Sequence, residues 1–168
     1  RDAENKDLED KIKAIEEYAQ RNKIYLYKKK RKEEEEKRKQ EELANKPSGY
    51  GHLSNADAQS FIYNYASQMT RAINENNFNL VSPYIYSSSP LYTQQINLVN
   101  SCVSQGITES FGGVTLNSLT KISDTKWDAK VTEKETVYYA DGSQKSKTFN
   151  WTYTLEYIGD QFYLTGIK

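Results

Sequence analysis

The fold is decided by residues 126–168, KWDAKVTEKETVYYADGSQKSKTFNWTYTLEYIGDQFYLTGIK. Apolar residues recur at every second position from Trp127 and again from Phe149, and such alternation is typical of strands with one buried face. Residues 140–143 (ADGS) and 159–160 (GD) supply turns between these stretches. The stretch therefore predicts an antiparallel meander of long strands that continues to the end of the chain.

Two amphipathic helices precede this meander. Residues 57–74 carry an apolar stripe on one face, and Ser54 is suited to cap this helix. A second stripe follows Pro90, which favours the first helical position, and Gly106 ends that helix. Both stripes need a partner surface, so we expect both helices to pack on the sheet. The second stripe comprises Leu91, Gln95, Leu98 and Cys102, with Ile96, Val99 and Val103 alongside.

Residues 107–123 predict a first pair of strands. Its halves, 107–111 and 114–123, are separated by Gly112-Gly113, which indicates a bulge or a bend. The order along the chain is then helix, short helical or irregular piece, helix, and four or five antiparallel strands. This order resembles the nuclear transport factor 2-like cone, an α+β fold in which helices pack on a strongly curved antiparallel sheet.

The first 46 residues have a different composition. They hold 15 basic and 13 acidic side chains, against 8 and 10 in residues 47–168, and the formal net charge is zero. This segment is too charged to form a core and contains neither Pro nor Gly, so we predict a long solvated stalk helix. Lysine and glutamate blocks between residues 28 and 39 are spaced to form pairs four residues apart. Neither part has the one-signed basic field that nucleic acid requires, so no nucleic-acid partner is expected.

A heptad seam runs along the first half of the predicted stalk. Its a and d positions are Leu8, Ile12, Ile15, Ala19, Asn22 and Leu26. A polar residue on such a seam, here Asn22, is typical of a contact that sets the register of a two-stranded coil. The seam makes a homodimer one hypothesis, and the alternative is a helix that lies against its own domain.

Residues 47–56 are predicted to link the stalk (1–46) to the folded domain (57–168), because Pro47 disfavours helix before it and two glycines follow. His52, in this linker, is expected to be exposed to solvent. Cys102 is the single cysteine and is expected to be a small buried hydrophobe. No metal-ligand spacing and no cofactor motif is present, so neither a metal nor a cofactor is expected.

Short motifs spread over residues 57–168 carry a further likeness. They are FIYNY at 61–65, AINENNF at 72–78, PYI at 83–85, SPLY at 89–92, EKE at 133–135, WTY at 151–153 and FYL at 162–164. With these motifs the stretch resembles the C-terminal domain of the TcaA family of Gram-positive envelope proteins. The resemblance implies a membrane protein with a cytoplasmic zinc ribbon, one transmembrane helix and an extracytoplasmic cone domain, associated with cell-wall or teichoic-acid physiology.

The sequence contains neither the zinc-ribbon cysteines nor an apolar run long enough to span a membrane. Because it begins at Arg1, we expect a missing N-terminal piece, for which a membrane anchor is the candidate. The expected location is the cell membrane, single-pass, with this segment outside the cytoplasm.

Two groups of residues are candidates for a ligand site. Tyr84, Tyr86 and Tyr92 flank a serine-rich loop, and a rigid ring with a polar tip suits recognition of glycans or peptides, although tyrosine also half-buries well as a packing residue. Glu133 and Glu135 continue the phase of the apolar residues before them, so one of them would face the interior of a cone if the strand does not bulge.

The main hypothesis is a non-enzymatic binding or sensing module that contacts cell-wall polymer or an envelope protein, with no catalytic residue assigned. One alternative is a cone-fold enzyme of isomerase or hydratase type that uses Glu133 or Glu135 as its acid or base. Another is a structural dimeriser that acts through the heptad seam. A deep apolar pocket with an inward carboxyl of raised pKa would favour the enzyme, and a cone filled by side chains would exclude it.

Overall fold

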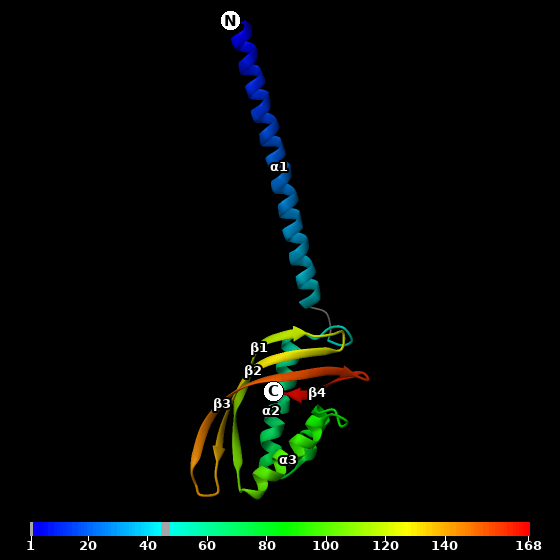
Figure 1. The fold of residues 1–168 in the computed structure, drawn as a ribbon, viewed down its shortest axis with the longest axis vertical. Helices are drawn as coiled ribbons and strands as arrows, with labels where there is room; N and C mark the ends of the chain where they lie inside the picture. The colour runs from blue at the N-terminus through cyan, green and yellow to red at the C-terminus, as the bar shows by residue number, and fades with distance from the viewer. Residues whose placement is uncertain (1, 45–47) are drawn as a thin grey trace. The chain divides into compact units, whose positions relative to one another are not determined.

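The structure, a computed structural model, describes residues 2–44 and 48–168. The chain divides into two compact units, Arg1–Lys46 and Pro47–Lys168. The first is the single helix α1 (Asp2–Ala44) and the second is a mixed helix and sheet domain, drawn in Figure 1.

Helix α1 has no core among its described side chains, all of which are exposed. Among the predicted pairs, Lys30 lies 3.8 Å from Glu34 and Lys39 lies 2.8 Å from Glu35, as expected for side chains four residues apart on a helix. Of the heptad seam, Asn22 and Leu26 are described and exposed, whereas the side chains of Leu8, Ile12, Ile15 and Ala19 lie outside the described residues.

The second unit contains one antiparallel sheet of four strands in the order β1-β2-β3-β4. The strands are β1 (Thr108–Lys121), β2 (Lys126–Tyr138), β3 (Gln144–Ile158) and β4 (Gln161–Ile167). Figure 1 shows the sheet bending around α2 (Asn55–Asn74), and α3 (Pro90–Ser104) contacts both α2 and β4. This arrangement confirms the predicted α+β cone of helices on a curved sheet.

The core lies between the helices and the concave face of the sheet. Its largest fully buried side chains are Ile62, Ile85, Leu91, Leu155, Leu164, Val81, Val99 and Val131. Two short 3-10 helices, Phe78–Leu80 and Ser82–Tyr84, join α2 to α3 and bring Ile85 beside Leu164 of β4. Burial of this apolar surface, at about 25 cal/mol per Å², is the main force that holds the cone together.

Helix α2 begins at its predicted cap but two residues earlier than expected. The Ser54 hydroxyl accepts a hydrogen bond from the Asp57 backbone N–H at 3.1 Å, so the helix starts at Asn55 rather than Asp57. This contact satisfies one of the backbone donors that a helix leaves unpaired at its first turn.

The structure confirms the bulge or bend predicted at Gly112-Gly113, but residues 108–121 form one bent strand rather than the predicted pair. The register of β1 against β2 shifts between Phe111 and Gly113, with no reversal of the chain. Gly113 has φ 109°, which favours glycine, and a Cβ on Gly112 would lie 2.8 Å from the carbonyl oxygen of Lys134. The two glycines therefore make a bulge that bends the sheet rather than a turn between strands.

Two amide side chains of α2 hydrogen-bond to the backbone of β1, which is an edge strand. Asn74 exchanges two 2.8 Å hydrogen bonds with the backbone of Glu109, and Gln59 accepts from Leu116 N–H at 2.6 Å and donates to the Val114 carbonyl at 2.9 Å. These contacts pair part of an otherwise open sheet edge and fix α2 against β1.

The expectation that His52 is exposed to solvent is wrong. The residue is only 8% exposed, and no hydrogen-bond partner is found for its Nδ1 among the described residues. A bridge between Gly49 and His52 and a 2.8 Å hydrogen bond from Gly51 N–H to the Asp124 carbonyl hold this turn on the domain. Part of the predicted linker is thus attached to the folded unit.

Candidate functional site

Strand β2 points its two central glutamates into the cone. Trp127, Ala129 and Val131 face the core, and the same alternation continues through Glu133, which is 4% exposed, and the half-buried Glu135. Because successive side chains of a strand point to opposite faces, residues two apart share the concave side. Both glutamates therefore face the concave side of the sheet, whereas the sequence pattern predicted this for one of them.

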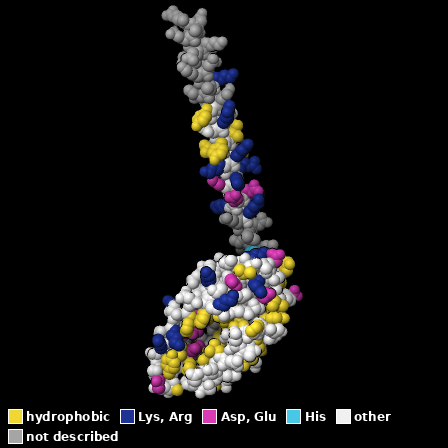
Figure 2. All heavy atoms as spheres, viewed as in Figure 1, with side chains coloured by type: hydrophobic (Ala, Val, Ile, Leu, Met, Phe, Trp, Pro, Cys, Tyr) yellow, Lys and Arg dark blue, Asp and Glu magenta, His cyan; other side chains and the backbone are white. Residues whose placement is uncertain are grey.

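The concave side of the sheet is not filled completely, and a cavity of about 370 Å³ remains. Figure 2 shows a hollow in this unit with acidic side chains inside it and hydrophobic side chains around it. The helices and all four strands contribute to the wall. The polar lining is Gln95, Glu109, Glu133, Glu135 and Lys147, and the aromatic lining is Tyr65, Tyr139, Phe149, Trp151 and Tyr153.

Glu133 is the deepest acid. Its Oε2 accepts a hydrogen bond of 2.9 Å from the Tyr153 hydroxyl, and both groups are buried. Burial raises the pKa of Glu133, and hydrogen bonds from Tyr153 and Glu135 oppose that rise. The pKa of Tyr153 is raised well above its ordinary value by burial and by the charge of Glu133, so its hydroxyl stays protonated as a donor.

Glu135 is the more strongly perturbed acid. Burial raises its pKa to about 8, the charges of Glu109 and Glu133 act in the same direction, and the charge of Lys147 opposes them. The hydrogen bond between the two carboxyls favours a proton on Glu135 and the charge on Glu133. At neutral pH Glu135 is therefore the protonated member of the pair.

A third acid and a base complete the charged groups of the wall. Burial raises the pKa of Glu109 on β1, and the charge of Glu133 raises it further. The Lys147 ammonium lies 5.9 Å from the centroid of the Phe149 ring, and that ring stacks on Trp151 at 5.3 Å with 17° between the planes. The cavity thus has an acidic side and an aromatic side, with one lysine at the aromatic side.

Cys102 lies buried in α3, as expected, and lines the cavity. Burial raises the pKa of its thiol, and the charges of Glu109 and Glu135 raise it further, so this cysteine remains a thiol. Leu98, expected to pack in the same stripe, is instead 44% exposed at the lining of the cavity. The core-facing positions of α3 are Leu91, Gln95, Val99 and Cys102.

The three loop tyrosines are not part of this cavity. Tyr84 packs edge-on against Phe61 with ring centroids 5.5 Å apart. Tyr86 contacts Tyr163 at 5.7 Å, and Tyr92 contacts Phe78 at 5.1 Å. Each ring is half-buried on a different partner, so the structure does not bring the tyrosines together with Glu133 and Glu135.

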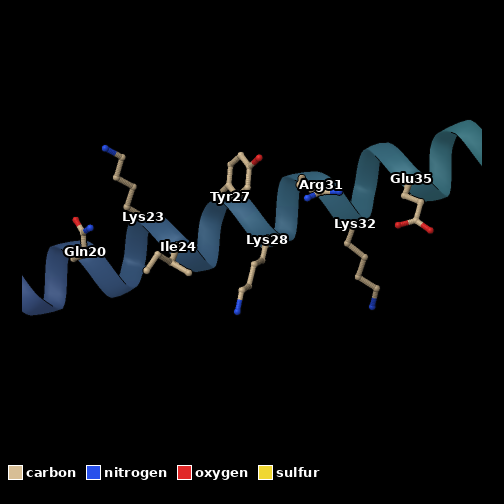
Figure 3. A pocket seen from close by; sticks show the side chains of 8 residues that line it. All are labelled: Gln20, Lys23, Ile24, Tyr27, Lys28, Arg31, Lys32 and Glu35. Atoms are coloured by element: carbon tan, nitrogen blue, oxygen red, sulfur yellow. The ribbon is translucent and has the colours of Figure 1, made fainter.

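A second concave surface lies along α1. Its eight residues come from one helix, and Figure 3 shows their side chains projecting to both sides of it. The surface is lined by Gln20, Lys23, Ile24, Tyr27, Lys28, Arg31, Lys32 and Glu35. A single helix encloses no volume, so this surface is not a site comparable with the cavity of the cone.

The sequence reasoning missed Glu109, Lys147, Phe149 and Trp151 as members of one site. A signal for three of them was present in the hairpin of residues 126–158. Once Tyr139 pairs with Ser143 across the turn, the register places Lys147 opposite Glu135 and Phe149 opposite Glu133. Glu109 had no such signal, because its position depends on the bulge at the two glycines.

Within the described part of the chain, no group of three or more His, Cys, Asp or Glu side chains is arranged to hold a metal ion. No helix within residues 2–44 or 48–168 is long and apolar enough to cross a membrane.

Two solved structures share the fold. The intermembrane space region of chloroplast protein ARC6 has a TM-score of 0.60 at 10% identity, covering 70% of this chain and 96% of that chain. An IcmL-like type IV secretion system protein from Legionella pneumophila has a TM-score of 0.51 at 12% identity, covering 72% and 93%. At these identities the likeness is one of fold alone.

Sequence comparison identifies a family. The chain is 29% identical over 124 residues to the uncharacterized membrane protein YvbJ of Bacillus subtilis (strain 168), which covers 74% of this chain. It spans only 20% of the length of that relative. Residues 54–168 match the family of the TcaA protein NTF2-like domain, as the sequence motifs predicted. The chain therefore belongs to the TcaA family and carries its NTF2-like domain.

Proposed function

We propose that this domain is a non-enzymatic binding module of the cell envelope, and that its ligand site is the cavity of the cone. The observation that carries the proposal is the open volume of about 370 Å³ between α2, α3 and the sheet. Sites for small ligands have volumes of about 300–1,000 Å³ and combine apolar walls with a few convergent polar groups. The cavity of this domain has both features.

The polar groups of the cavity reduce the stability of the domain. Buried carboxyls, whose pKa values burial raises, are less favourable than apolar side chains of the same size. Glu133 and Glu135 occupy positions whose neighbours Val131 and Val137 are apolar and buried, so the strand itself does not require acids there. Their presence supports a role in binding rather than in folding.

The proposed ligand is cell-wall polymer, or an envelope protein as the second choice. The relative YvbJ is named a membrane protein, and we propose a single membrane span before this segment, with the domain outside the cytoplasm. In this arrangement α1 would be the stalk, and the stalk would end before residues 48–54, which belong to the domain. The cone would then be the part that reaches the wall. The loop with Tyr84, Tyr86 and Tyr92 remains a proposed second contact surface for the same ligand.

Binding to sacculi of Bacillus subtilis, which contains the relative YvbJ, tests the proposed ligand site. Leu98→Trp would obstruct the cavity from a position that is 44% exposed, so the core should be little disturbed. Asn97→Trp is a matched control, because Asn97 is exposed on the same helix and does not line the cavity. We expect the Leu98 variant to lose sedimentation with sacculi and the control to keep it. Equal binding by both variants would refute the cavity as the ligand site.

The proposed location has its own test in whole cells that carry the full-length protein. Ser87 is exposed in the loop before α3, and Cys102 is buried, so Ser87→Cys adds one accessible thiol. A membrane-impermeant maleimide should label this variant on intact cells. Labelling only after lysis would place the domain inside the cytoplasm.

A second candidate function is acid–base catalysis, and one observation favours it. The cone is open rather than filled, and Glu135, with its pKa raised to about 8, carries a proton at neutral pH that it could donate to a substrate. Soluble fragments of sacculi incubated with the chain should stay unchanged in mass and retention if the domain only binds. Turnover that Glu135→Gln abolishes would establish the enzyme.

A third candidate is dimerisation through the seam Leu8, Ile12, Ile15, Asn22 and Leu26. Three heptads are marginal for a stable coil, and the exposure of Leu26 is consistent with a missing partner helix. Sedimentation equilibrium of the chain with and without residues 1–46 decides the matter. A monomer in both cases would eliminate the dimer.

A further inference from the structure

We propose that the group which the cavity receives is a primary ammonium borne by the wall polymer, and that it binds between the acids of β2 and the aromatic rings of β3. This inference depends on the proposed function, because it names the chemistry recognised at the same site.

The charge of the wall argues against an anionic ligand. Three carboxyls, Glu109, Glu133 and Glu135, line the cavity, against a single ammonium from Lys147. Lys147 is the only cation among these lining residues, and each acid that ionises adds negative charge to the wall. A phosphate or carboxylate entering this space would meet like charge in a partly desolvated site, where repulsion is strong, whereas an ammonium would be attracted.

The protein's own lysine shows where an ammonium fits. Lys147 Nζ lies 5.9 Å from the Phe149 centroid, within the distance at which a cation is attracted to the face of a ring. The same ammonium lowers the pKa of Glu135 and of Glu109 through its charge. A second ammonium that enters the cavity beside the stacked Phe149 and Trp151 would find the same two partners, a ring face and a carboxylate.

Binding of an ammonium should release a proton. Glu135 carries a proton at neutral pH, and a cation beside it favours the ionised form. The other titratable groups facing the cavity are Glu133 on β2, Glu109 on β1, Tyr65 on α2, Cys102 on α3, Tyr139, and Lys147 and Tyr153 on β3. Burial raises the pKa of Tyr65, Tyr153 and Cys102, so these three stay neutral over the same range. Apparent affinity should therefore rise with pH until Glu135 is ionised in the free protein, near pH 8.

Three small probes of similar length test the sign of the charge. Hexylammonium, hexanol and hexanoate are titrated into the full 168-residue chain, and binding is followed by the shift of the Trp151 indole signal in NMR spectra. We expect hexylammonium to bind more than tenfold more tightly than hexanoate, with hexanol between them. Its affinity should rise more than about tenfold from pH 6 to pH 8, because one proton must leave.

Single substitutions test how much each charged group contributes to the binding of these probes. Lys147→Gln removes the resident cation, so it should strengthen hexylammonium binding severalfold and weaken hexanoate binding. Lys145→Gln, at an exposed position two residues away and outside the cavity, should change neither. Glu135→Gln should weaken hexylammonium binding and reduce its pH dependence while leaving hexanol binding intact, which also shows that the variant is folded. Tighter binding of hexanoate, or weaker ammonium binding after Lys147→Gln, would overturn the inference.

Sacculi provide the test with the proposed ligand. Acetylation of their primary amines with acetic anhydride should abolish sedimentation of the chain, and prior protease treatment should not, if the amines belong to the polymer. If acetylated sacculi bind as before while Leu98→Trp still abolishes binding, the ammonium inference fails and the proposed function stands. If Leu98→Trp and Asn97→Trp bind equally, the proposed function itself fails.

Discussion

Glu35 on α1 and Glu135 in the cone are the same side chain beside a lysine, but their pKa values move in opposite directions. Glu35 forms an exposed ion pair with Lys39 at 2.8 Å, and the hydrogen bond and charge of that lysine lower its pKa. Glu135 has Lys147 nearby, yet burial raises its pKa to about 8. The comparison teaches that burial can outweigh the charge of a nearby lysine, whereas a direct ion pair decides the direction of the shift for a solvated acid.

The same contrast separates how the two units are stabilised. The described side chains of α1 are solvated, so that helix depends on helix-forming residues and local pairs. The domain depends on a buried apolar core and tolerates three acids in its cavity because that core is large enough. Substitutions that act on burial should therefore affect the domain and leave α1 unchanged.

The largest effect is expected from the core. Ile62 of α2 is 1% exposed, so Ile62→Ala should lower the free energy of unfolding by about 2–5 kcal/mol through lost burial and a new cavity. The matched change on α1 is Leu26→Ala, at a residue 61% exposed, and we expect less than about 0.5 kcal/mol. Urea unfolding followed by tryptophan fluorescence measures both. Similar losses for the two variants would mean that α1 has a buried face.

The next effect is a fall in stability as pH rises. In the unfolded chain Glu135 loses its proton near the ordinary glutamate pKa of 4.5, whereas in the folded domain it keeps the proton up to about 8. Its contribution to stability is therefore fully present below pH 4.5 and is lost as pH rises to 8. Allowing for solvent at the partly open cavity, we expect a loss of about 1–3 kcal/mol between about pH 5 and pH 8.5, measured by urea unfolding.

Glu135→Gln serves as the control for this pH dependence. The amide cannot ionise, so the variant should be more stable than the parent at about pH 8.5 and its stability should change less with pH. Burial raises the pKa of Glu133 and Glu109 as well, so some pH dependence should remain. Acids whose pKa is lowered in the folded domain, such as Asp57 and Asp124, change the free energy of unfolding only below about pH 4. They therefore do not contribute to the pH dependence above about pH 5. Stability that rises with pH would contradict the protonated state of Glu135.

Local patterns were enough to predict the architecture and the two glutamates of the site on β2. Ser54 and Pro90 marked the starts of α2 and α3, since caps and helix-initiating prolines act within one turn. The strand alternation placed Glu133 and Glu135 on the apolar face, because side-chain direction in a strand follows from position alone.

Contacts between distant segments could not be predicted in the same way. His52 is buried because the turn before α2 hydrogen-bonds to Asp124, which lies more than 70 residues later in the sequence. Tyr86 is a candidate for ligand contact by its place in the sequence, but its ring lies against Tyr163 of β4. The position of Glu109 depends on how the bulge at Gly112-Gly113 shifts the register, and composition does not specify that shift.

A smaller effect is expected at the start of α2. Ser54→Ala removes the hydroxyl that accepts from Asp57 N–H and also one of the two hydroxyls that hydrogen-bond the Asp57 carboxylate. Loss of such a cap should lower the free energy of unfolding by about 1 kcal/mol. Ser87→Ala is a suitable control, because Ser87 is exposed in a loop and makes no cap. Equal unfolding midpoints for the two variants would show that Ser54 does not stabilise the helix.

The smallest effect is expected on α1, where only solvated pairs are at stake. Lys39→Gln removes the partner of Glu35, so the pKa of Glu35 should return toward its ordinary value and the helical signal at about 222 nm should fall slightly at low salt. In about 1 M salt, where charges are screened over about 3 Å, the difference should disappear. The urea midpoint of the domain should not move, because α1 belongs to a separate compact unit. A change in that midpoint would show that the two units are coupled. The opposite pKa shifts of Glu35 and Glu135 could then no longer be assigned to two independent units.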